Sequence, residues 1–125
     1  MKTEDIEFKA KTCDGEWVYG CYAEYKAFGE EVRRVIIDRR GSSESIMPET
    51  LCEYSRKRDK NGAKIYENDL VRMYVVNTTY YKRPFEEEVC GEVCRGDDGA
   101  FHISANGGPK YTFNNTMVVV GSKFD

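Results

Sequence analysis

Two cysteines, Cys90 and Cys94, precede the only histidine, His102, and these three side chains are of the types that bind metal ions. Zinc sites use four ligands, often with a cysteine pair a few residues apart. In a strand, however, residues four apart share a face but stand about 13 Å from each other. A strand therefore cannot bring both thiols to one ion, and we expect small, half-buried side chains here, with no metal and no cofactor.

A catalytic nucleophile would need a neighbouring base, and His102 is the one histidine in the sequence that could serve as that base. Phe101 and Ile103 flank it, which favours a solvent-facing position in the middle of a strand. General acid–base chemistry needs shielded carboxylates, whereas the acidic runs at residues 86–88 and 97–98 are predicted at solvated loop tips. We therefore predict no catalytic residue and expect no enzyme.

The strongest candidate for binding is a basic stretch. Residues 54–64, YSRKRDKNGAK, hold five positive charges against one negative. Arginine side chains and aromatic rings can hold phosphates and stack on bases. The net charge of −3 nevertheless lacks the basic excess of a general nucleic-acid binder. The candidate contacts for nucleic acid or a partner are Arg33, Arg34, Arg56, Lys57, Arg58 and Lys60. A solvated, charged hairpin tip is the open alternative.

A second mixed patch surrounds Tyr80 and Tyr81, with Lys82, Arg83 and Phe85 close by in the chain. Tyrosine and arginine are enriched at protein interfaces. Exposed strand edges of a small β protein also accept an added strand from a partner. This segment therefore predicts contact with an unidentified protein partner or with a second copy of the chain.

The elements that must position these residues are predicted to be strands. The chain has 125 residues, of which 40% are apolar, 33% charged and 13% aromatic, with nine tyrosines. This composition is typical of one globular domain rich in strands. No apolar run approaches the ~20 residues of a membrane helix, and the N-terminus lacks the apolar core of a secretory signal. We therefore expect a cytoplasmic location, no membrane contact and five free cysteine thiols.

Turn signals recur about every ten residues, a spacing typical of sandwiches and small barrels. The clearest are Asp14-Gly15, Asn61-Gly62 and the run at residues 96–99. Gly20 is predicted as a bulge within a strand, and the expected loops are residues 39–45 and 77–88. The one weak helix candidate is Glu49–Arg58. The predicted fold is all-β, with an internal division near residues 39–50 but one packed unit, because neither half suffices for its own core.

The stretch IMPETLCEYSRKRDKNGAKIYENDLV resembles the central signature of the YopX family, I-x-P-E-T-x-G-Q-[YF]-T-G-L-x-D-x-N-G-x-x-I-[YF]-E-G-D-I-V. The early IEFKAKTCDGEWVYG and the later Gly91-Glu92-Val93 with Gly99-Ala100-Phe101 are similar to other family segments, as is Val120-Gly121-Ser122 near the end. The residues that fit the central signature are Pro48, Glu49, Thr50, Tyr54, Asp59, Lys60, Asn61, Gly62, Ile65, Tyr66, Glu67, Asp69 and Val71.

The chain departs from the signature at Cys52, at residues 55–57 and at Asn68, which replaces a usual glycine. Asparagine tolerates a positive φ, so we expect Asn68 to adopt one. Arg56 and Lys57 add charge to this loop. A surface role that the loop has in the family is therefore not carried over to this chain.

The resemblance implies a single mostly-β domain over residues 1–125. It would consist of an irregular N-terminal β part at about 1–45 and an SH3-like barrel at about 60–125. It also implies a phage or prophage origin, hence the cytoplasm of a bacterial host, and it implies no biochemical activity. The first hypothesis is a non-enzymatic accessory protein that binds a protein partner or itself. The alternative is a nucleic-acid-binding accessory protein that uses the basic loop.

Overall fold

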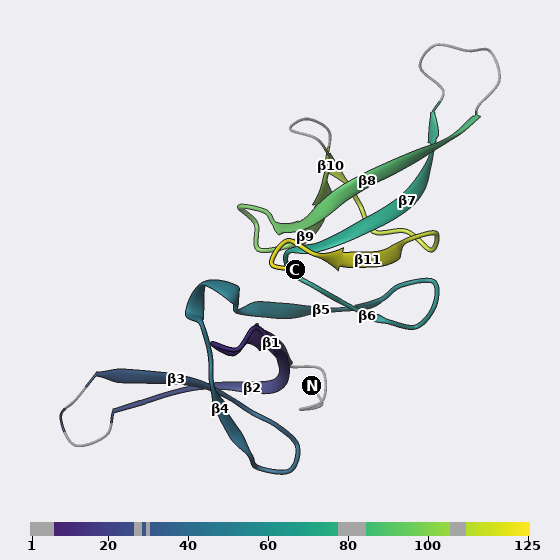
Figure 1. Cartoon of the computed structure of the whole chain (residues 1–125). Helices are drawn as coiled ribbons and strands as arrows, with labels where there is room; N and C mark the ends of the chain where they lie inside the picture. The colour runs from purple at the N-terminus through teal and green to yellow at the C-terminus, as the bar shows by residue number, and fades with distance from the viewer. Residues whose placement is uncertain (1–6, 27–28, 30, 78–84, 106–109) are drawn as a thin grey trace. The chain divides into compact units, whose positions relative to one another are not determined.

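The computed structural model describes residues 7–26, 29, 31–77, 85–105 and 110–125 (Figure 1). The fold is all-β, as predicted, with two antiparallel sheets and one short 3₁₀ helix among the described residues. The chain divides into two compact units, Met1–Arg56 and Lys57–Asp125. This boundary lies after the division expected near residues 39–50. The single domain and the SH3-like barrel stay predictions.

The first unit contains an antiparallel sheet in the order β4-β3-β2-β1-β5. Its strands are β1 (Phe8–Lys11), β2 (Trp17–Lys26), β3 (Val32–Ile37), β4 (Ser43–Ser45) and the start of β5 (Cys52–Arg58). The predicted turn before Trp17 is present, since the N–H of Thr12 donates to the carbonyl of Glu16 at 2.9 Å. The prediction of a loop over residues 39–45 missed the short strand β4.

Gly20 marks the point where β2 changes partner. Residues up to Gly20 pair with β1, and those from Cys21 onward pair with β3. A Cβ atom at Gly20 would overlap the carbonyl of Ile37, and its φ is +155°. The close approach of the two backbones therefore requires glycine at this position.

The 3₁₀ helix η2 (Pro48–Thr50) returns the chain to β1. The Thr50 hydroxyl accepts the N–H of Lys11 at 2.8 Å and donates to the carbonyl of Met47 at 2.7 Å. The prediction of a helix over Glu49–Arg58 is wrong from Cys52 onward. Cys52 and Tyr54 are buried and alternate with less buried neighbours, which is the period of a strand.

The second unit contains a five-stranded antiparallel sheet in the order β10-β9-β8-β7-β11. Its strands are β7 (Asp69–Asn77), β8 (Phe85–Arg95), β9 (Phe101–Ser104), β10 (Lys110–Tyr111) and β11 (Val118–Ser122). The end of β5 and β6 (Lys64–Tyr66) form a hairpin closed by the predicted Asn61-Gly62 turn. The prediction of a loop over residues 77–88 is wrong at the C-terminal end of that range, because Glu86 to Glu88 pair with β7.

The alternation along β7 separates the core of the second unit from its outer face. Val71 and Met73 are fully buried, whereas Leu70, Tyr74 and Val76 are exposed. The core cluster consists of Ile65, Val71, Met73, Val89, Val93, Ile103, Ala105 and Met117. We call the opposite side of this sheet, with the β7 residues Leu70, Arg72, Tyr74 and Val76, the outer face.

Candidate functional site

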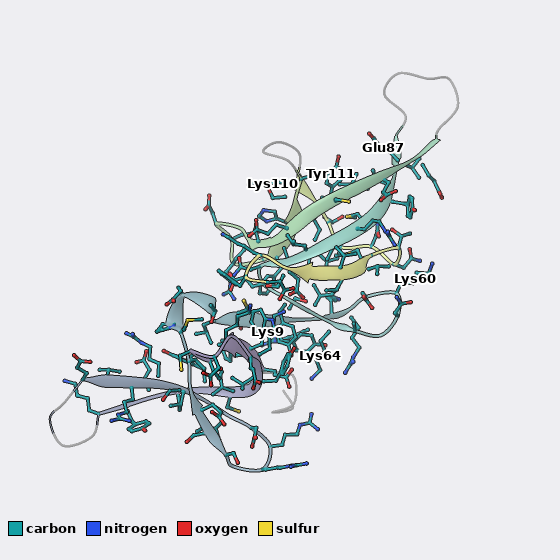
Figure 2. The ribbon with its side chains drawn as sticks, in the orientation of Figure 1. Lys9, Lys60, Lys64, Glu87, Lys110 and Tyr111 are labelled. Atoms are coloured by element: carbon teal, nitrogen blue, oxygen red, sulfur yellow. The ribbon has the colours of Figure 1, made fainter. Side chains whose placement is uncertain are left out.

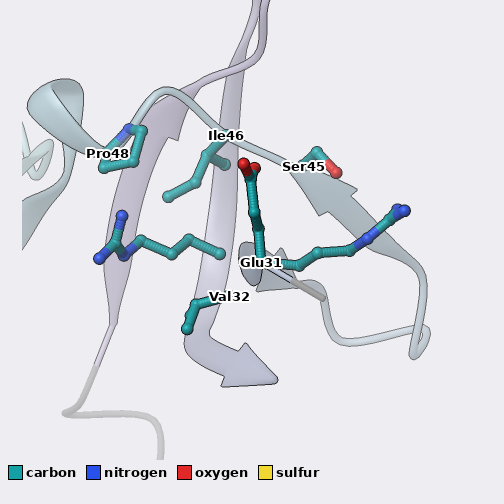
Figure 3. A pocket seen from close by; sticks show the side chains of 7 residues that line it. Glu31, Val32, Ser45, Ile46 and Pro48 are labelled. Atoms are coloured by element: carbon teal, nitrogen blue, oxygen red, sulfur yellow. The ribbon is translucent and has the colours of Figure 1, made fainter. Parts of the chain in front are cut away.

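A groove with a volume of about 620 Å³ lies at the edge of β3 in the first unit. We call it the β3 groove. It is lined by Glu31, Val32, Arg33, Arg34, Ser45, Ile46 and Pro48. Figure 3 shows Ile46 and Pro48 on the side of the groove opposite Val32. The groove combines apolar walls with charged side chains.

The groove exists because β4 is short. β4 pairs only with residues 35–37 of β3, and the last contact along this edge is the N–H of Ile46 donating to the carbonyl of Arg34 at 3.2 Å. Pro48 then takes the chain into η2. Backbone groups alternate in direction along an antiparallel strand, so Val32 points its N–H and C=O to the same side as Arg34. The backbone of Val32 therefore faces the side that β4 leaves uncovered.

The two arginines of the groove have different surroundings. Arg34 Nε lies 3.4 Å from Glu24 Oε1, and the Tyr22 hydroxyl donates to the same oxygen at 2.7 Å. The Tyr22 hydrogen bond, followed by that of Arg34, lowers the pKa of Glu24. Burial, followed by the hydrogen bond to Glu24, raises the pKa of Tyr22.

Arg33 pairs across the strands with Tyr25, one residue out of step with Arg34, so it projects from the other face. Among the described residues, no carboxylate forms a salt bridge with Arg33. Its guanidinium group therefore places a positive charge at the edge of β3 that a carboxylate of a ligand can pair with.

The second predicted site, the basic hairpin, is only partly assembled. Lys57 and Arg58 line a groove of about 270 Å³ with Phe113, Asn114, Asn115 and Met117 among its other walls. The guanidinium group of Arg58 donates to the carbonyl of Gly62 at 2.8 Å. The N–H of Lys60 donates to the carbonyl of Met117 at 2.8 Å, and Figure 2 shows its side chain near the tip of the hairpin.

The eight residues predicted as contacts are distributed over the chain. Arg33 and Arg34 belong to the first unit, whereas Lys57, Arg58 and Lys60 belong to the second. Arg56 ends the first unit and has a positive φ of 69°. Tyr80 and Tyr81 lie outside the described residues.

Asp59, which fits the YopX signature that residues 46–71 resemble, has a structural role at the hairpin. Its carboxylate accepts the N–H groups of Asn61 at 2.8 Å, Ala63 at 2.9 Å and Val119 at 2.9 Å. Burial alone would raise the pKa of Asp59, but these N–H groups, with that of Gly62, lower it below its usual value. The carboxylate joins the hairpin to β11, and both of its oxygens already accept backbone N–H groups.

The second turn cluster of the signature is also structural. Asn68 has a φ of 69°, so the predicted positive φ is confirmed. Its N–H donates to the carbonyl of Val93 and its own carbonyl accepts the N–H of Lys123, both at 2.8 Å. The buried Asp69 accepts the N–H of Tyr66 at 2.9 Å. These contacts hold the start of β7 in place.

Cys94 and His102 lie directly opposite each other on β8 and β9, a pairing that the sequence pattern did not predict. Burial, followed by the charge of Glu92, raises the pKa of the Cys94 thiol. A nucleophilic cysteine needs the reverse shift, toward the thiolate. No disulfide forms among the five cysteines, which all lie in described ranges, and Cys90 shares the outer face with Cys94 four residues away. Cys94 and His102 therefore offer no activated nucleophile.

One of the two acidic runs differs from its predicted position, and the other lies in the predicted turn. Glu86 to Glu88 lie within β8 instead of a loop tip, and Glu88 lies 4.0 Å from Arg72. The turn at residues 96–99 is present, with Asp98 accepting the N–H of Ala100 at 3.0 Å. No group of three or more potential metal ligands occurs within the described part of the chain.

Sequence reasoning missed Ile46, Pro48 and Glu31 as lining residues of the β3 groove. The available signal was Pro48, which ends the pairing of a short polar segment with its neighbour. The missing information was the strand order, because an edge is defined only by which strands pair.

Comparison with models of protein families and with curated proteins finds no match to this sequence. In the described residues, no helix has the length and apolar character needed to cross a membrane.

Proposed function

We propose that this protein is a phage or prophage accessory protein that acts as a non-enzymatic protein-binding module. The β3 groove is its binding site, and the ligand is an extended segment of a partner protein with an acidic side chain. The origin rests on the resemblance of residues 46–71 to the YopX signature. The binding role rests on the groove.

The observation that carries this proposal is the early end of β4 beside an uncovered strand edge. An added strand would bond to the backbone of Val32 and place its side chains between Val32, Ile46 and Pro48. Arg33 would pair with a carboxylate of the partner. Arg34, already held by Glu24, would form the wall of the groove.

The partner can be sought by co-purification with the tagged full chain from phage-infected cells, with and without nuclease. We expect a protein that remains bound after nuclease treatment. Loss of every captured protein on nuclease treatment would contradict a direct protein contact.

Two variants test whether the captured protein occupies the β3 groove. Val32→Pro removes an N–H that points away from β2, which an edge position tolerates. Arg33→Glu reverses the charge that the partner's carboxylate would meet. We expect each to weaken binding about tenfold or more, the equivalent of ~1.4 kcal/mol.

Arg40→Glu, in the exposed turn after β3, makes the same charge change outside the groove and should leave binding within about twofold, well under the ~1.4 kcal/mol of a tenfold loss. Thermal unfolding checks that all three variants fold. Equal binding by folded Val32→Pro and wild-type protein would place the partner elsewhere.

A second candidate function, nucleic-acid binding, is favoured by one observation. Lys57 and Arg58 line the same groove as Phe113, so positive charge and an aromatic ring converge within one unit. Such a combination suits single-stranded nucleic acid, where phosphates contact cations and bases stack on rings.

This candidate predicts that single-stranded DNA or RNA binds with an affinity that falls steeply as salt rises. Lys57→Gln should weaken binding and lower the salt slope by about one, whereas Lys110→Gln on β10 should change neither. Fluorescence anisotropy with labelled oligonucleotides measures both. The absence of binding at low salt would remove the candidate.

A further inference from the structure

The β3 groove contains a carboxylate as well as two arginines. Glu31 directly precedes β3 and lines the groove, and Figure 3 shows its side chain pointing toward Ser45 and Ile46. Among the described residues, no salt bridge involves Glu31. Its negative charge is therefore a feature that any ligand in this groove meets.

The segment that follows β4 leaves the edge of β3 beside this carboxylate. The N–H of Ile46 donates to the carbonyl of Arg34 at 3.2 Å, but the N–H of Met47 already donates to the carbonyl of Lys11 in β1 at 2.8 Å. The chain therefore turns from β3 to β1 within one residue. A partner strand that takes the vacated edge must lie against Val32 and also against Glu31.

Glu31 and Arg33 present opposite charges two residues apart along this edge. An extended chain advances about 3.3 Å per residue, so residues two apart in it are separated by about 7 Å. Arg34 adds little free charge, because its Nε already lies 3.4 Å from the carboxylate of Glu24. The open edge therefore offers one negative and one positive position to an extended ligand.

These two positions make different demands on a ligand. Covering a carboxylate without supplying a cation is unfavourable, because the charge loses water and gains no partner. Opposite charges on neighbouring strands stabilise their pairing, whereas like charges destabilise it. A ligand with acidic side chains alone would meet Arg33 favourably and Glu31 unfavourably. The groove should therefore distinguish between acidic segments by the residue two positions from the acid.

We propose that the ligand of the β3 groove is an extended segment with one acidic and one basic side chain two positions apart. The acid pairs with Arg33 and the base pairs with Glu31, so Glu31 determines specificity. This inference rests on the proposed function, because it assigns the class of segment that the same groove binds. A partner that runs antiparallel to β3, as β4 does, carries these residues in the order acidic, apolar, basic.

Fluorescence anisotropy with two labelled peptides tests this assignment. Both have an uncharged frame of serine and threonine, and their central residues are Asp-Val-Lys in one and Asp-Val-Asp in the other. With the wild-type full chain at low salt, where exposed charges are least screened, we expect the first peptide to bind at least about threefold tighter. Glu31→Lys should reverse this preference, because the diacidic peptide then meets two cations.

Glu44→Lys is the matched control for general charge attraction. It makes the same charge change on the exposed strand β4, at a residue that does not line the groove. We expect it to keep the wild-type preference. A reversal in Glu44→Lys as large as that in Glu31→Lys would overturn the inference.

Val32→Pro separates this inference from the proposed function. If wild type binds both peptides equally and Val32→Pro weakens both, the groove accepts extended segments regardless of Glu31, and only the present inference fails. Peptide binding that Val32→Pro leaves unchanged would contradict the proposed groove as well. So would the absence of binding of either peptide up to about 1 mM, which corresponds to a binding free energy of about −4 kcal/mol.

Discussion

At the residue scale, the buried carboxylate of Asp59 has a structural role within the stretch that resembles the YopX signature. Its two oxygens satisfy the turn at Asn61 and Ala63 and also an N–H of β11. Thr50 has a similar role, since its hydroxyl joins η2 to β1. The recognisable residues of this stretch are therefore ones that stabilise the fold. Ligand contacts are better sought among residues outside the signature, such as Arg33.

Asp59→Asn should destabilise the protein by about 1–3 kcal/mol, because an amide N–H₂ would replace the oxygen that accepts the N–H of Val119. Chemical denaturation at pH 7 measures the change in the free energy of unfolding. Asp97→Asn, in the exposed turn after β8, should change it little. Equal stabilities for the two variants would contradict the role of Asp59.

The stability of the wild-type protein should also depend on the ionisation of Asp59. Its pKa is lower in the folded state than the usual 3.8, so the stabilisation is fully present above that value. It is lost as the pH falls through the lowered folded pKa. The free energy of unfolding, measured from pH 6 down to pH 2, should fall more steeply for wild type than for Asp59→Asn. A parallel decline would argue against this linkage.

At the element scale, most strand assignments follow from alternation and turn chemistry, and the errors have identifiable causes. The acidic run at residues 86–88 suggested a loop, but cross-strand pairing with β7 and the charge of Arg72 hold it in β8. The short polar strand β4 has no apolar alternation of its own, so pairing with β3 alone defines it. Local pattern cannot reveal a strand stabilised mainly by its neighbour.

Gly20→Ala should be among the most damaging single substitutions in the first unit. Its Cβ would overlap the carbonyl of Ile37, so β2 and β3 must separate, at a cost of about 3 kcal/mol. Gly15→Ala also adds a Cβ at a positive φ but meets no atom within 4 Å, so about 1–2 kcal/mol is expected. Thermal melts of both variants compare the two costs. A smaller effect at Gly20 would contradict the close-approach explanation.

At the scale of the whole molecule, the described residues form two antiparallel sheets with one short 3₁₀ helix. Far-ultraviolet circular dichroism should therefore show the single broad minimum of β structure and lack the double minimum of an α-helix. A clear helical spectrum from the folded full chain would contradict the fold, and with it the resemblance to the YopX family.

The sequence by itself determined the fold class and the position of the turns. Positive φ at Gly15, Gly62 and Asn68, and period-two burial along β7, depend on each residue and its immediate neighbours. The tertiary structure decided which strands pair, and therefore where an edge stays open. Asp59 meets Val119 at a separation of 60 residues, and β4 stops beside Arg34. Such contacts depend on the packing of distant segments, which local pattern does not encode, so the grooves emerge only from the folded chain.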